Sequence, residues 1–362
     1  MKYTCLGEKK LLNFGLLGCG KISVRHSNLL GHGEIEGAKL SAVCDKNLES
    51  AKKIGEKFNV PFFNDISEMM NSCKLDVVVV LTPSGMHAKN TIELSKYGCD
   101  ILVEKPMALT LDDADQMINA CNEANVRLFI VKQNRFNLPI TALRDALDSG
   151  RFGKLSLGTI RVRWCRHQPY YDADSWRGTW AFDGGVIANQ ASHHIDLLEW
   201  MMGDIESVFA KSINALAKIE AEDTAIATIK FKNGALGLIE ATTATRPIDL
   251  EGSLSILGES GTVEVSGFAA NRMQTWQFEN EQESDKYIFE EFLENPQHKF
   301  GYAHKKYYEH VVDCIQKDSS LLVDGIEGKK SLKLINAIYK SIETNKEIFL
   351  DSDFGSSRLG KT

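Results

Sequence analysis

Between residues 13 and 134 the sequence alternates short, continuously apolar runs with segments of helical periodicity. Because these runs lack the polar alternation of half-exposed strands, they predict strands buried on both faces, as in a parallel sheet covered by helices. The predicted strands are Phe14–Leu17, Leu40–Val43, Val77–Leu81, Ile101–Val103 and Leu128–Val131. The predicted helices are Ile22–Leu30, Leu48–Phe58, Ile66–Met70, His87–Tyr97 and Leu111–Ala124. This order predicts a doubly wound α/β domain.

A different pattern begins near residue 150. Several segments have the alternation of strands in an open, largely antiparallel sheet, and Asn233-Gly234 predicts a hairpin turn. These segments are Thr159–Arg166, Ala225–Phe231, Ala235–Thr243, Ser253–Leu257 and Thr262–Val265. Helical periodicity is found at Val186–Met202, His304–Gln316 and Ile326–Thr344. We therefore expect a first domain at residues 13–134, a second α+β domain at 135–352 and a loose polar tail at 353–362.

Charge and cysteine usage exclude several classes of protein. The net charge is −7, and no Lys/Arg-rich run suggests binding to nucleic acid or to a membrane surface. Eight cysteines occur without a C-x-x-C pair, so we expect free thiols, no disulfide and no metal site. No apolar signal core follows the first residues. These features predict a cytoplasmic protein.

A glycine-rich loop follows the first predicted strand. Gly18, Gly20 and Ser23 form a G-x-G-x-x-S pattern between that strand and a helix, where glycines let the backbone approach a pyrophosphate. The second predicted strand ends at Asp45, whose carboxylate would bind the adenosine ribose and repel a 2′-phosphate. The alternative is a tight turn with an unrelated surface aspartate. We expect a Rossmann domain that binds NAD in preference to NADP.

Two further strands end in polar residues at the same edge of this sheet. One is followed by Thr82-Pro83 and, a helical turn later, by His87; the other is followed by Glu104-Lys105 and a proline. Ligands of open α/β sheets bind at the carboxyl ends of the strands, so Lys105 is predicted to face the nicotinamide end of the cofactor. The alternative is a surface lysine paired with Glu104.

A second polar cluster lies on the predicted helix Val186–Met202. Asn189, His193 and Asp196 are spaced i, i+4 and i+7, which places them on one helix face. A single helical histidine is often structural, but this one adjoins a polar stripe in a chain whose cofactor site still needs an acid–base group. Its neighbour His194 points elsewhere, and two adjacent histidines cannot share one ion.

The motifs together resemble the Gfo/Idh/MocA family of oxidoreductases, whose hallmark is a Rossmann domain carrying E-K-P and a second domain with an open sheet. The resemblance covers roughly residues 13–350, and the segment from Tyr170 to Asp196 narrows it to WlbA-type dehydrogenases. The matching segments are Thr82-Pro83-Ser84-Gly85-x-His87, Glu104–Ala108, Val131–Arg135, Tyr170–Ala173, Trp176–Trp180, Phe182–Gly185, Asn189–His193 and Glu222–Thr224. Many members of the wider family have Asp at the position of Asn189, whereas WlbA-type enzymes are similar to this chain in having Asn.

This resemblance implies NAD-dependent oxidation of the 3-hydroxyl of UDP-2-acetamido-2-deoxy-D-glucuronate to a 3-keto sugar, a precursor of the 2,3-diamino sugars of surface polysaccharide. His193 would be the general base and Lys105 would stabilise the alkoxide, although these two roles could be exchanged. It also implies a cis Lys105–Pro106 bond, and a second substrate, 2-oxoglutarate, that reoxidises the cofactor in some relatives.

The site residues are assigned to two groups. The cofactor group is Gly18, Cys19, Gly20, Lys21, Ile22, Asp45, Thr82, Pro83, His87, Glu104, Lys105, Trp176 and Arg177. The substrate group is Gln133, Asn134, Arg135, Arg163, Arg166, Tyr171, Asn189, Gln190 and His193. The arginines are included because the substrate carries a diphosphate and a carboxylate.

Two alternatives to this function remain open at the level of sequence: a dehydrogenase of another sugar or polyol such as inositol, and a non-catalytic protein that senses dinucleotide.

The second domain also predicts an oligomer. Its few helices can cover only one face of the sheet, and we expect Thr228, Ala235, Gly237, Ile239 and Ala241 on the other face. That face would pack against a second subunit, most simply in a homotetramer, the assembly that the resemblance also implies.

Overall fold

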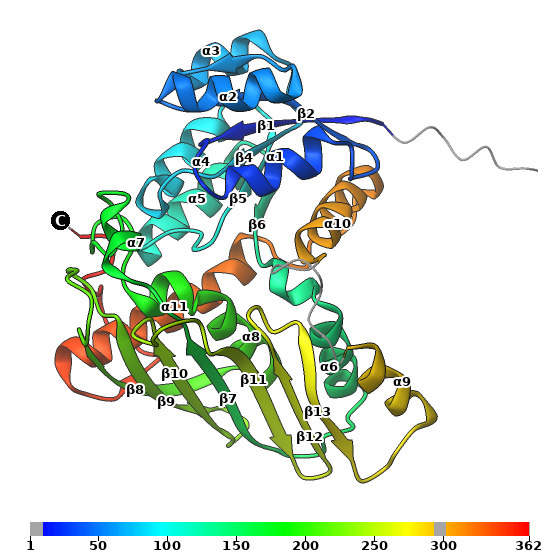
Figure 1. The fold of residues 1–362 in the computed structure, drawn as a ribbon, viewed down its shortest axis with the longest axis vertical. Helices are drawn as coiled ribbons and strands as arrows, with labels where there is room; N and C mark the ends of the chain where they lie inside the picture. The colour runs from blue at the N-terminus through cyan, green and yellow to red at the C-terminus, as the bar shows by residue number, and fades with distance from the viewer. Residues whose placement is uncertain (1–9, 293–301, 362) are drawn as a thin grey trace, which may run out of the picture.

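The computed structural model describes residues 10–292 and 302–361, which form two domains (Figure 1). The first contains a six-stranded parallel sheet in the order β3-β2-β1-β4-β5-β6, a doubly wound arrangement. Its strands are β1 (Leu12–Leu17), β2 (Ala38–Cys44), β3 (Phe62–Phe63), β4 (Val77–Val80), β5 (Asp100–Val103) and β6 (Leu128–Ile130). The five predicted strands are confirmed. The sequence missed β3 because two residues are too short to show a period.

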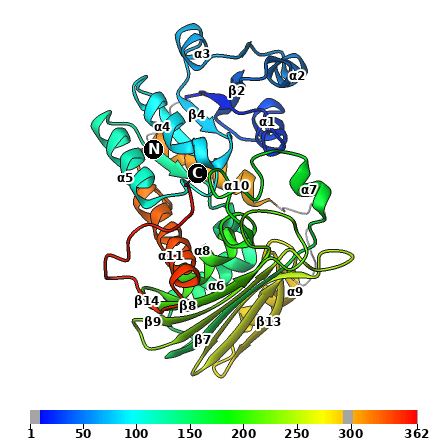
Figure 2. The ribbon, with the colours of Figure 1, turned by 90° about the vertical axis from the view of Figure 1, so that its left-hand side faces the viewer.

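Helices cover both faces of this sheet, as the apolar strands require (Figure 2). They are α1 (Ser23–Gly31), α2 (Leu48–Phe58), α3 (Ile66–Ser72), α4 (His87–Ser95) and α5 (Leu111–Glu123). All five were predicted to within a few residues. Two buried clusters, one on each face of the sheet, form the core of the domain.

The second domain is built on an eight-stranded sheet in the order β13-β12-β11-β7-β10-β9-β8-β14. Its strands are β7 (Leu155–Arg163), β8 (Ile205–Ile213), β9 (Thr224–Phe231), β10 (Leu236–Thr242), β11 (Glu251–Gly258), β12 (Gly261–Ser266), β13 (Arg272–Phe278) and β14 (Ile348–Phe349). Only β7 and β10 pair in parallel, so the sheet is mixed but mostly antiparallel. The sequence missed β8, β13 and β14.

Helices α8 (Ser192–Met202) and α11 (Gly325–Thr344) lie on one face of this sheet, between the sheet and the first domain (Figures 1 and 2). The other helices in this half of the chain are α6 (Leu138–Asp148), α7 (Gln168–Asp172), α9 (Glu283–Glu291) and α10 (Ala303–Lys317). The predicted helix Val186–Met202 is divided: a single π-helical turn, Val186–Gln190, precedes α8. We refer to residues 186–190 as the π-turn.

Helix α10 and the C-terminal tail differ from the prediction. Helix α10 belongs to the second half of the chain, yet Tyr307, Tyr308 and Val311 are buried in the core beside the first sheet. Part of the expected loose tail is packed: Leu359 is 1% exposed, and the N–H of Gly360 donates to the carbonyl of Trp180, whereas most of the other described residues from 353 on are exposed. No described helix has the length and apolar character needed to cross a bilayer.

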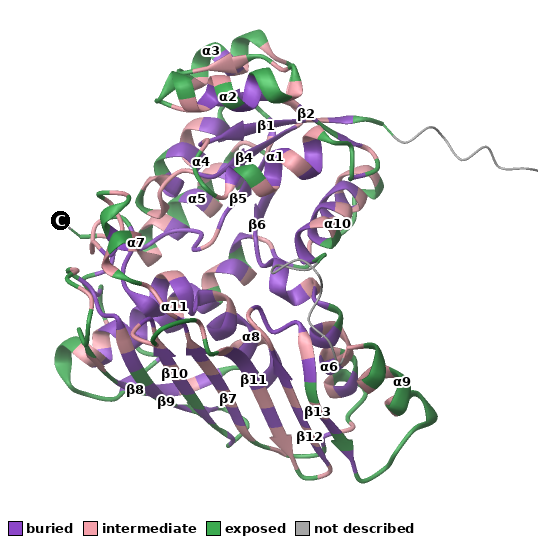
Figure 3. Ribbon diagram, viewed as in Figure 1, coloured by how far each residue is buried: buried purple, intermediate pink, exposed green. Residues whose placement is uncertain are grey.

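The outer face of the second sheet carries different residues from those predicted. Ala235, Gly237, Ile239 and Ala241 are buried toward the helices, because the alternation of β10 is shifted by one residue from the prediction. The residues that face outward instead include Phe209, Ile226, Leu236 and Leu238, together with Thr228, all of them exposed. The strands therefore alternate between buried and exposed positions (Figure 3), and the outer face is still partly apolar.

Candidate functional site

The glycine loop leaves room for a dinucleotide at the end of β1. Gly18 has φ +103°, and a Cβ there would lie 2.7 Å from the carbonyl carbon of Leu81, so only glycine fits. A Cβ at Gly20 would meet nothing within 4 Å, which leaves open space in front of α1. Ser23 occupies the third position of the motif, and its hydroxyl donates to the carbonyl of Gly20 at 2.5 Å. The loop therefore fits a pyrophosphate at the start of a helix.

Asp45 lies beside this loop, as the sequence predicted for a ribose-binding carboxylate. Its Oδ2 accepts a hydrogen bond from the N–H of Cys19 at 2.7 Å, and its Oδ1 accepts one from the N–H of Asn47 at 2.8 Å. These contacts fix the carboxylate at the tip of β2, one strand away from the loop. Ile22, also assigned to the cofactor group, packs partly against the core of the domain.

His87 lies between the loops that follow β4 and β5. Its Nδ1 lies 2.8 Å from the carbonyl oxygen of Pro106, and its Nε2 lies 2.8 Å from that of Thr82. The ring is 1% exposed, and burial lowers the pKa of His87. Both ring nitrogens are thus used within the protein, so the structure gives His87 the role of holding the loops that follow β4 and β5 together.

Glu104 is held in a buried network. Its Oε1 lies 3.0 Å from Nε2 of His26, whose Nδ1 lies 2.6 Å from the hydroxyl of Tyr308. Burial raises the pKa of Glu104, but the hydrogen bond and charge of His26 outweigh it and hold this pKa below its ordinary value. Among the described residues, His26, Glu104 and His304 form the one group whose spacing suits a metal ion, and the sequence did not predict it.

Lys105 follows Glu104 and extends into the second domain. The Lys105–Pro106 bond is cis, which confirms the expectation from the sequence. The Nζ of Lys105 donates to the backbone carbonyl of Asn189 at 2.9 Å, while Oε2 of Glu104 accepts the backbone N–H of Lys105. Burial lowers the pKa of Lys105, and the nearby charges of Glu104 and Asp183 oppose that change. The lysine thus lies at the carboxyl edge of the sheet, as predicted.

His193 is the second ionisable group of the site. The side-chain amide nitrogen of Gln133 lies 3.0 Å from its Nε2, and its Nδ1 makes no hydrogen bond to a described residue. Burial, followed by the charges of Lys105 and Lys132, lowers the pKa of His193 well below its ordinary value. The imidazole is therefore neutral at pH 7, the form that can accept a proton.

The π-turn places Asn189 between Lys105 and a buried carboxylate. Its side-chain amide donates to Oδ1 of Asp183, and its carbonyl accepts from Lys105. Burial raises the pKa of the Asp183 carboxyl to about 6. The predicted polar stripe is thus divided among partners, because Asn189 contacts Asp183 and Lys105, whereas Gln133 contacts His193.

All four candidate substrate arginines form ion pairs: Arg166 with Asp249, Arg177 with Asp174, and the other two with two carboxylates each. Arg135 is 3% exposed and forms two hydrogen bonds to Asp196, of 2.8 and 2.9 Å, and a third to Glu327 at 2.9 Å. Arg163 lies on the opposite side of the sheet from α8, where it pairs with Glu240 and Glu251. The structure therefore sets both arginines apart from the Lys105–His193 cluster.

The other two arginines surround Tyr170. The guanidinium carbon of Arg177 lies 4.7 Å from the centre of the Tyr170 ring and that of Arg166 lies 5.5 Å from it. Arg177 also donates to the hydroxyl of Tyr170 at 2.9 Å, and Nζ of Lys21 lies 5.9 Å from the ring centre. Since Lys21 belongs to the glycine loop, α7 lies close to the cofactor loop, as Figure 2 also shows.

Sequence reasoning missed three residues of this region: Lys132, Tyr170 and Asp183. Each belongs to a motif segment that was identified; for Lys132 and Tyr170 a neighbouring residue was chosen, whereas no residue of the Phe182–Gly185 segment was assigned to the site. Tyr171, for example, was assigned to the site, yet it is 5% exposed and its hydroxyl bonds to Thr243 at 2.8 Å. Of the remaining predicted residues, Gln190 reaches the Tyr170 hydroxyl at 3.4 Å, Trp176 stacks with Arg177, and Asn134 is buried beside Gln133.

The assembled site can move a proton and a hydride. A neutral imidazole and a lysine lie at the carboxyl edge of a sheet whose glycine loop accommodates a dinucleotide, and three cations surround a tyrosine at the rim. A hydroxyl bound between His193 and Lys105 could lose its proton to one and be stabilised by the other as hydride leaves carbon.

Comparison with known proteins agrees with this geometry. Residues 12–132 match the oxidoreductase family described as an NAD-binding Rossmann fold, and residues 144–350 match its C-terminal alpha/beta domain. The WlbA dehydrogenase of Bordetella pertussis, solved with NADH and UDP-GlcNAcA, is 40% identical with a TM-score of 0.88, covering 94% of this chain and 98% of that one.

Two further relatives show how wide the family is. The WlbA dehydrogenase of Chromobacterium violaceum, also solved with NADH and UDP-GlcNAcA, is 38% identical with a TM-score of 0.88, covering 95% of this chain and 97% of that one. The myo-inositol 2-dehydrogenase of Thermotoga maritima is 26% identical over 353 residues, which cover 95% of this chain and 100% of that protein. With both family domains matched in order, this chain belongs to the Gfo/Idh/MocA family and is an NAD-dependent oxidoreductase.

Proposed function

We propose that the protein oxidises the 3-hydroxyl of UDP-2-acetamido-2-deoxy-D-glucuronate to the 3-keto sugar. The observation that carries this proposal is the cluster of Lys105, His193 and Asn189 at the carboxyl edge of the NAD-binding sheet, in a chain 40% identical to a dehydrogenase solved with UDP-GlcNAcA. The inositol dehydrogenase is more distant, at 26% identity. A dinucleotide sensor would not need both reactive groups, so we favour an enzyme.

The chain's own residues supply the acid–base chemistry. His193, neutral because of burial and its cationic neighbours, accepts the proton of the 3-hydroxyl at Nε2. The Lys105 ammonium, anchored on the Asn189 carbonyl, donates a hydrogen bond to the alkoxide that develops on that oxygen. Bound NAD supplies the acceptor for the hydride that leaves carbon 3. The products are the 3-keto sugar, NADH and a proton held by the histidine.

The anionic groups of the substrate would meet the cations around Tyr170. Arg166, Arg177 and Lys21 surround that ring, and Arg166 and Arg177 each also pair with one carboxylate, that of Asp249 and that of Asp174. Arg135 and Arg163 each pair with two carboxylates. We assign diphosphate or carboxylate binding to the Tyr170 group. The product would enter the synthesis of 2,3-diamino sugars of surface polysaccharide in the cytoplasm, a reducing compartment that suits the unpaired cysteines of the described chain.

Turnover of defined substrates tests this function. The purified protein is mixed with NAD and, separately, with UDP-N-acetylglucosaminuronate, UDP-N-acetylglucosamine, inositol or free glucuronate, and the absorbance of reduced nicotinamide is followed. Adding 2-oxoglutarate tests whether the enzyme holds NADH and needs a second substrate. Reduced nicotinamide with the first substrate alone is the expected result; equal rates with inositol would overturn the proposal.

Cofactor choice gives a prediction at Asp45. In Asp45→Ser, the loss of the carboxylate beside Cys19 should weaken NAD binding and reduce the discrimination against NADP, because no charge is left to repel the 2′-phosphate. Titration calorimetry with both cofactors measures this. Equal affinities for NAD and NADP in the unaltered protein would contradict the role of Asp45.

Oligomerisation is proposed from the outer face of the second sheet. Phe209, Thr228 and Leu238 are adjacent in the strand register and exposed, which is an apolar surface that a second copy can cover. We expect light scattering to give a homotetramer, near four times the chain mass of 40.3 kDa, and Leu238→Arg to lower that mass. Lys230→Arg, on the same face with its charge kept, is the control. A mass near 40 kDa for the unaltered protein at micromolar concentration would exclude the assembly.

A further inference from the structure

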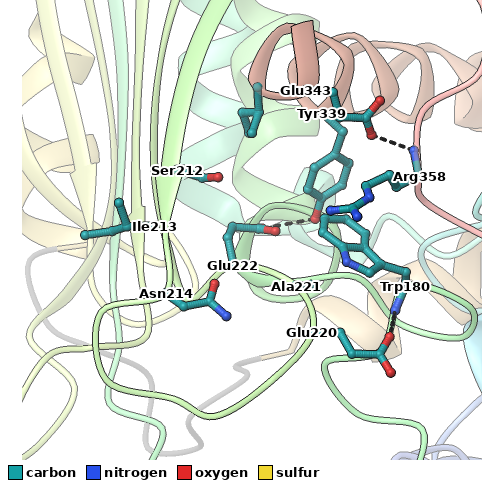
Figure 4. Close-up of a pocket in the computed structure, with 11 residues that line it drawn as sticks. Trp180, Ser212, Ile213, Asn214, Glu220, Ala221, Glu222, Tyr339, Glu343 and Arg358 are labelled. Atoms are coloured by element: carbon teal, nitrogen blue, oxygen red, sulfur yellow. Dashed lines mark hydrogen bonds between the residues drawn. The ribbon is translucent and has the colours of Figure 1, made fainter. Parts of the chain in front are cut away.

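Two buried side chains from distant parts of the chain bind the start of the π-turn. The hydroxyl of Tyr339 accepts the N–H groups of Gly185 at 3.1 Å and Ala188 at 3.3 Å, and it donates to Oε1 of Glu222 at 3.0 Å. The same Oε1 accepts the N–H of Ile187 at 3.0 Å. Figure 4 shows the Tyr339–Glu222 bond at the inner wall of a cavity of about 330 Å³. We call Tyr339 and Glu222 the clamp.

The other end of the π-turn contacts Lys105. The N–H of Asn189 donates to the carbonyl of Gly185 at 3.0 Å, and the carbonyl of Asn189 accepts from Nζ of Lys105 at 2.9 Å. The clamp therefore fixes Gly185, and through one turn of backbone it fixes the oxygen on which the lysine is anchored. No side chain of the clamp needs to touch a ligand for this effect.

Gly185, directly before the π-turn, is explained by the clamp. A Cβ there would lie 2.2 Å from the backbone oxygen of Glu222 and 2.4 Å from its Oε1. Gly184 has φ +78°, which favours glycine, and a Cβ there would first meet Ala188 and Leu359. Gly185 thus lets Glu222 approach the backbone, so the close contact is a specific feature of this turn.

We infer that Tyr339 and Glu222 are positioning residues for the dehydrogenase reaction, holding the Asn189 carbonyl where it orients the Lys105 ammonium. This inference rests on the proposed function for its catalytic consequence. Glu222 acts through its Oε1, which accepts both the hydroxyl of Tyr339 and the N–H of Ile187, as an amide oxygen also could. Burial raises the pKa of its carboxyl to about 7. A neutral amide at this position can therefore replace it.

Tyr339→Phe tests the clamp with little change in shape. Removing the hydroxyl leaves two buried N–H groups without an acceptor, so the π-turn should relax and kcat should fall about tenfold. The affinity for NAD should stay unchanged, because the glycine loop is in the other domain. The limb of the pH–rate profile that Lys105 controls should move to lower pH, since a displaced carbonyl stabilises the ammonium less.

Matched variants separate positioning from packing. Tyr307→Phe removes a hydroxyl from another buried tyrosine, one whose oxygen makes no hydrogen bond to a described residue, and should leave kcat and the pH profile unchanged. Glu222→Gln keeps the acceptor and should retain activity, whereas Glu222→Leu should behave like Tyr339→Phe. Circular dichroism verifies that each variant is folded.

A readout without substrate distinguishes this inference from the proposed function. Titration of Lys105 by NMR in lysine-labelled protein, assigned with Lys105→Ala, should give a lower pKa in Tyr339→Phe than in the unaltered protein and in Tyr307→Phe. No turnover of the UDP-sugar by the unaltered protein would end the proposed function but not the clamp. An unchanged Lys105 titration in Tyr339→Phe would overturn the clamp, whatever the substrate.

Discussion

Lys105→Ala and His193→Asn should each reduce turnover by about a hundredfold or more while NAD still binds, because each change removes a group that handles the proton or the developing alkoxide. Both side chains lie at the carboxyl edge of the sheet, Lys105 on the Asn189 carbonyl and His193 beside Gln133. Neither residue belongs to the glycine loop. Steady-state kinetics with UDP-N-acetylglucosaminuronate, together with calorimetric titration of NAD, measure the two effects separately.

The pH–rate profile should show whether His193 or Lys105 is the base. Burial and cationic neighbours lower the pKa of His193 from 6.5, so a histidine base gives an acidic limb below pH 6.5 and high activity at neutral pH. Burial also lowers the pKa of Lys105, from 10.5. A lysine base would be protonated at neutral pH unless that lowering is large, and its acidic limb would lie well above that of histidine.

A control variant and two contradicting outcomes test the roles given to Lys105 and His193. Lys132→Met removes a neighbouring cation that is bonded to Asp196 and Ser331, so it tests whether any loss of positive charge has the same effect. Near-normal turnover in Lys105→Ala or in His193→Asn would remove that residue from the mechanism. A loss of NAD binding in either variant would show that the change acts through the fold or the cofactor site.

Arg135→Met should destabilise the protein by about 3–5 kcal/mol, because it leaves carboxylates buried without their main partner. The guanidinium is 3% exposed and bonds to Asp196 and Glu327. Although burial raises the pKa of Asp196, the charges of Arg135 and Lys132 hold that pKa below its ordinary value, so the carboxylate stays ionised. Denaturant unfolding measures the change in the free energy of unfolding.

Arg163→Met is the matched control. Arg163 also pairs with two carboxylates, but its side chain is 32% exposed, so its loss should cost no more than about 1 kcal/mol. The sequence assigned both arginines to the substrate, and the two variants distinguish that assignment from the structural role. A normally stable Arg135→Met with a raised KM for the UDP-sugar would restore the original assignment.

Local patterns in the sequence were sufficient for the first domain and for one edge of the site. The apolar runs that became β1, β4 and β5 need no partner to be recognised, since burial on both faces is visible in the run itself. The glycine loop, Asp45 and Lys105 follow directly from where those strands end, because the carboxyl ends of parallel strands meet at one edge. The sequence therefore determined the cofactor and the position of the lysine.

Those local patterns could not decide which of two adjacent residues faces the site or the core. Tyr170 and Tyr171 are neighbours in one short helix, and only the packed structure shows that Tyr170 meets the cations while Tyr171 bonds to Thr243. In β10 the prediction was displaced by one residue, which exchanged the inward and outward faces. The period of two did not show which alternation is buried, because one contains Ala, Gly and Ile and the other contains two Leu beside Glu and Thr.

The sequence by itself determined the family and the NAD-binding fold, because both depend on short segments with a fixed local geometry. Only the tertiary structure decided the partners of the charged side chains. Arg135 meets Glu327 across 192 residues, Lys105 meets Asn189 across 84, and Tyr339 meets Glu222 across 117. Such contacts depend on how separate elements pack, and an arginine that binds a buried carboxylate has the same local sequence signature as one that binds a phosphate.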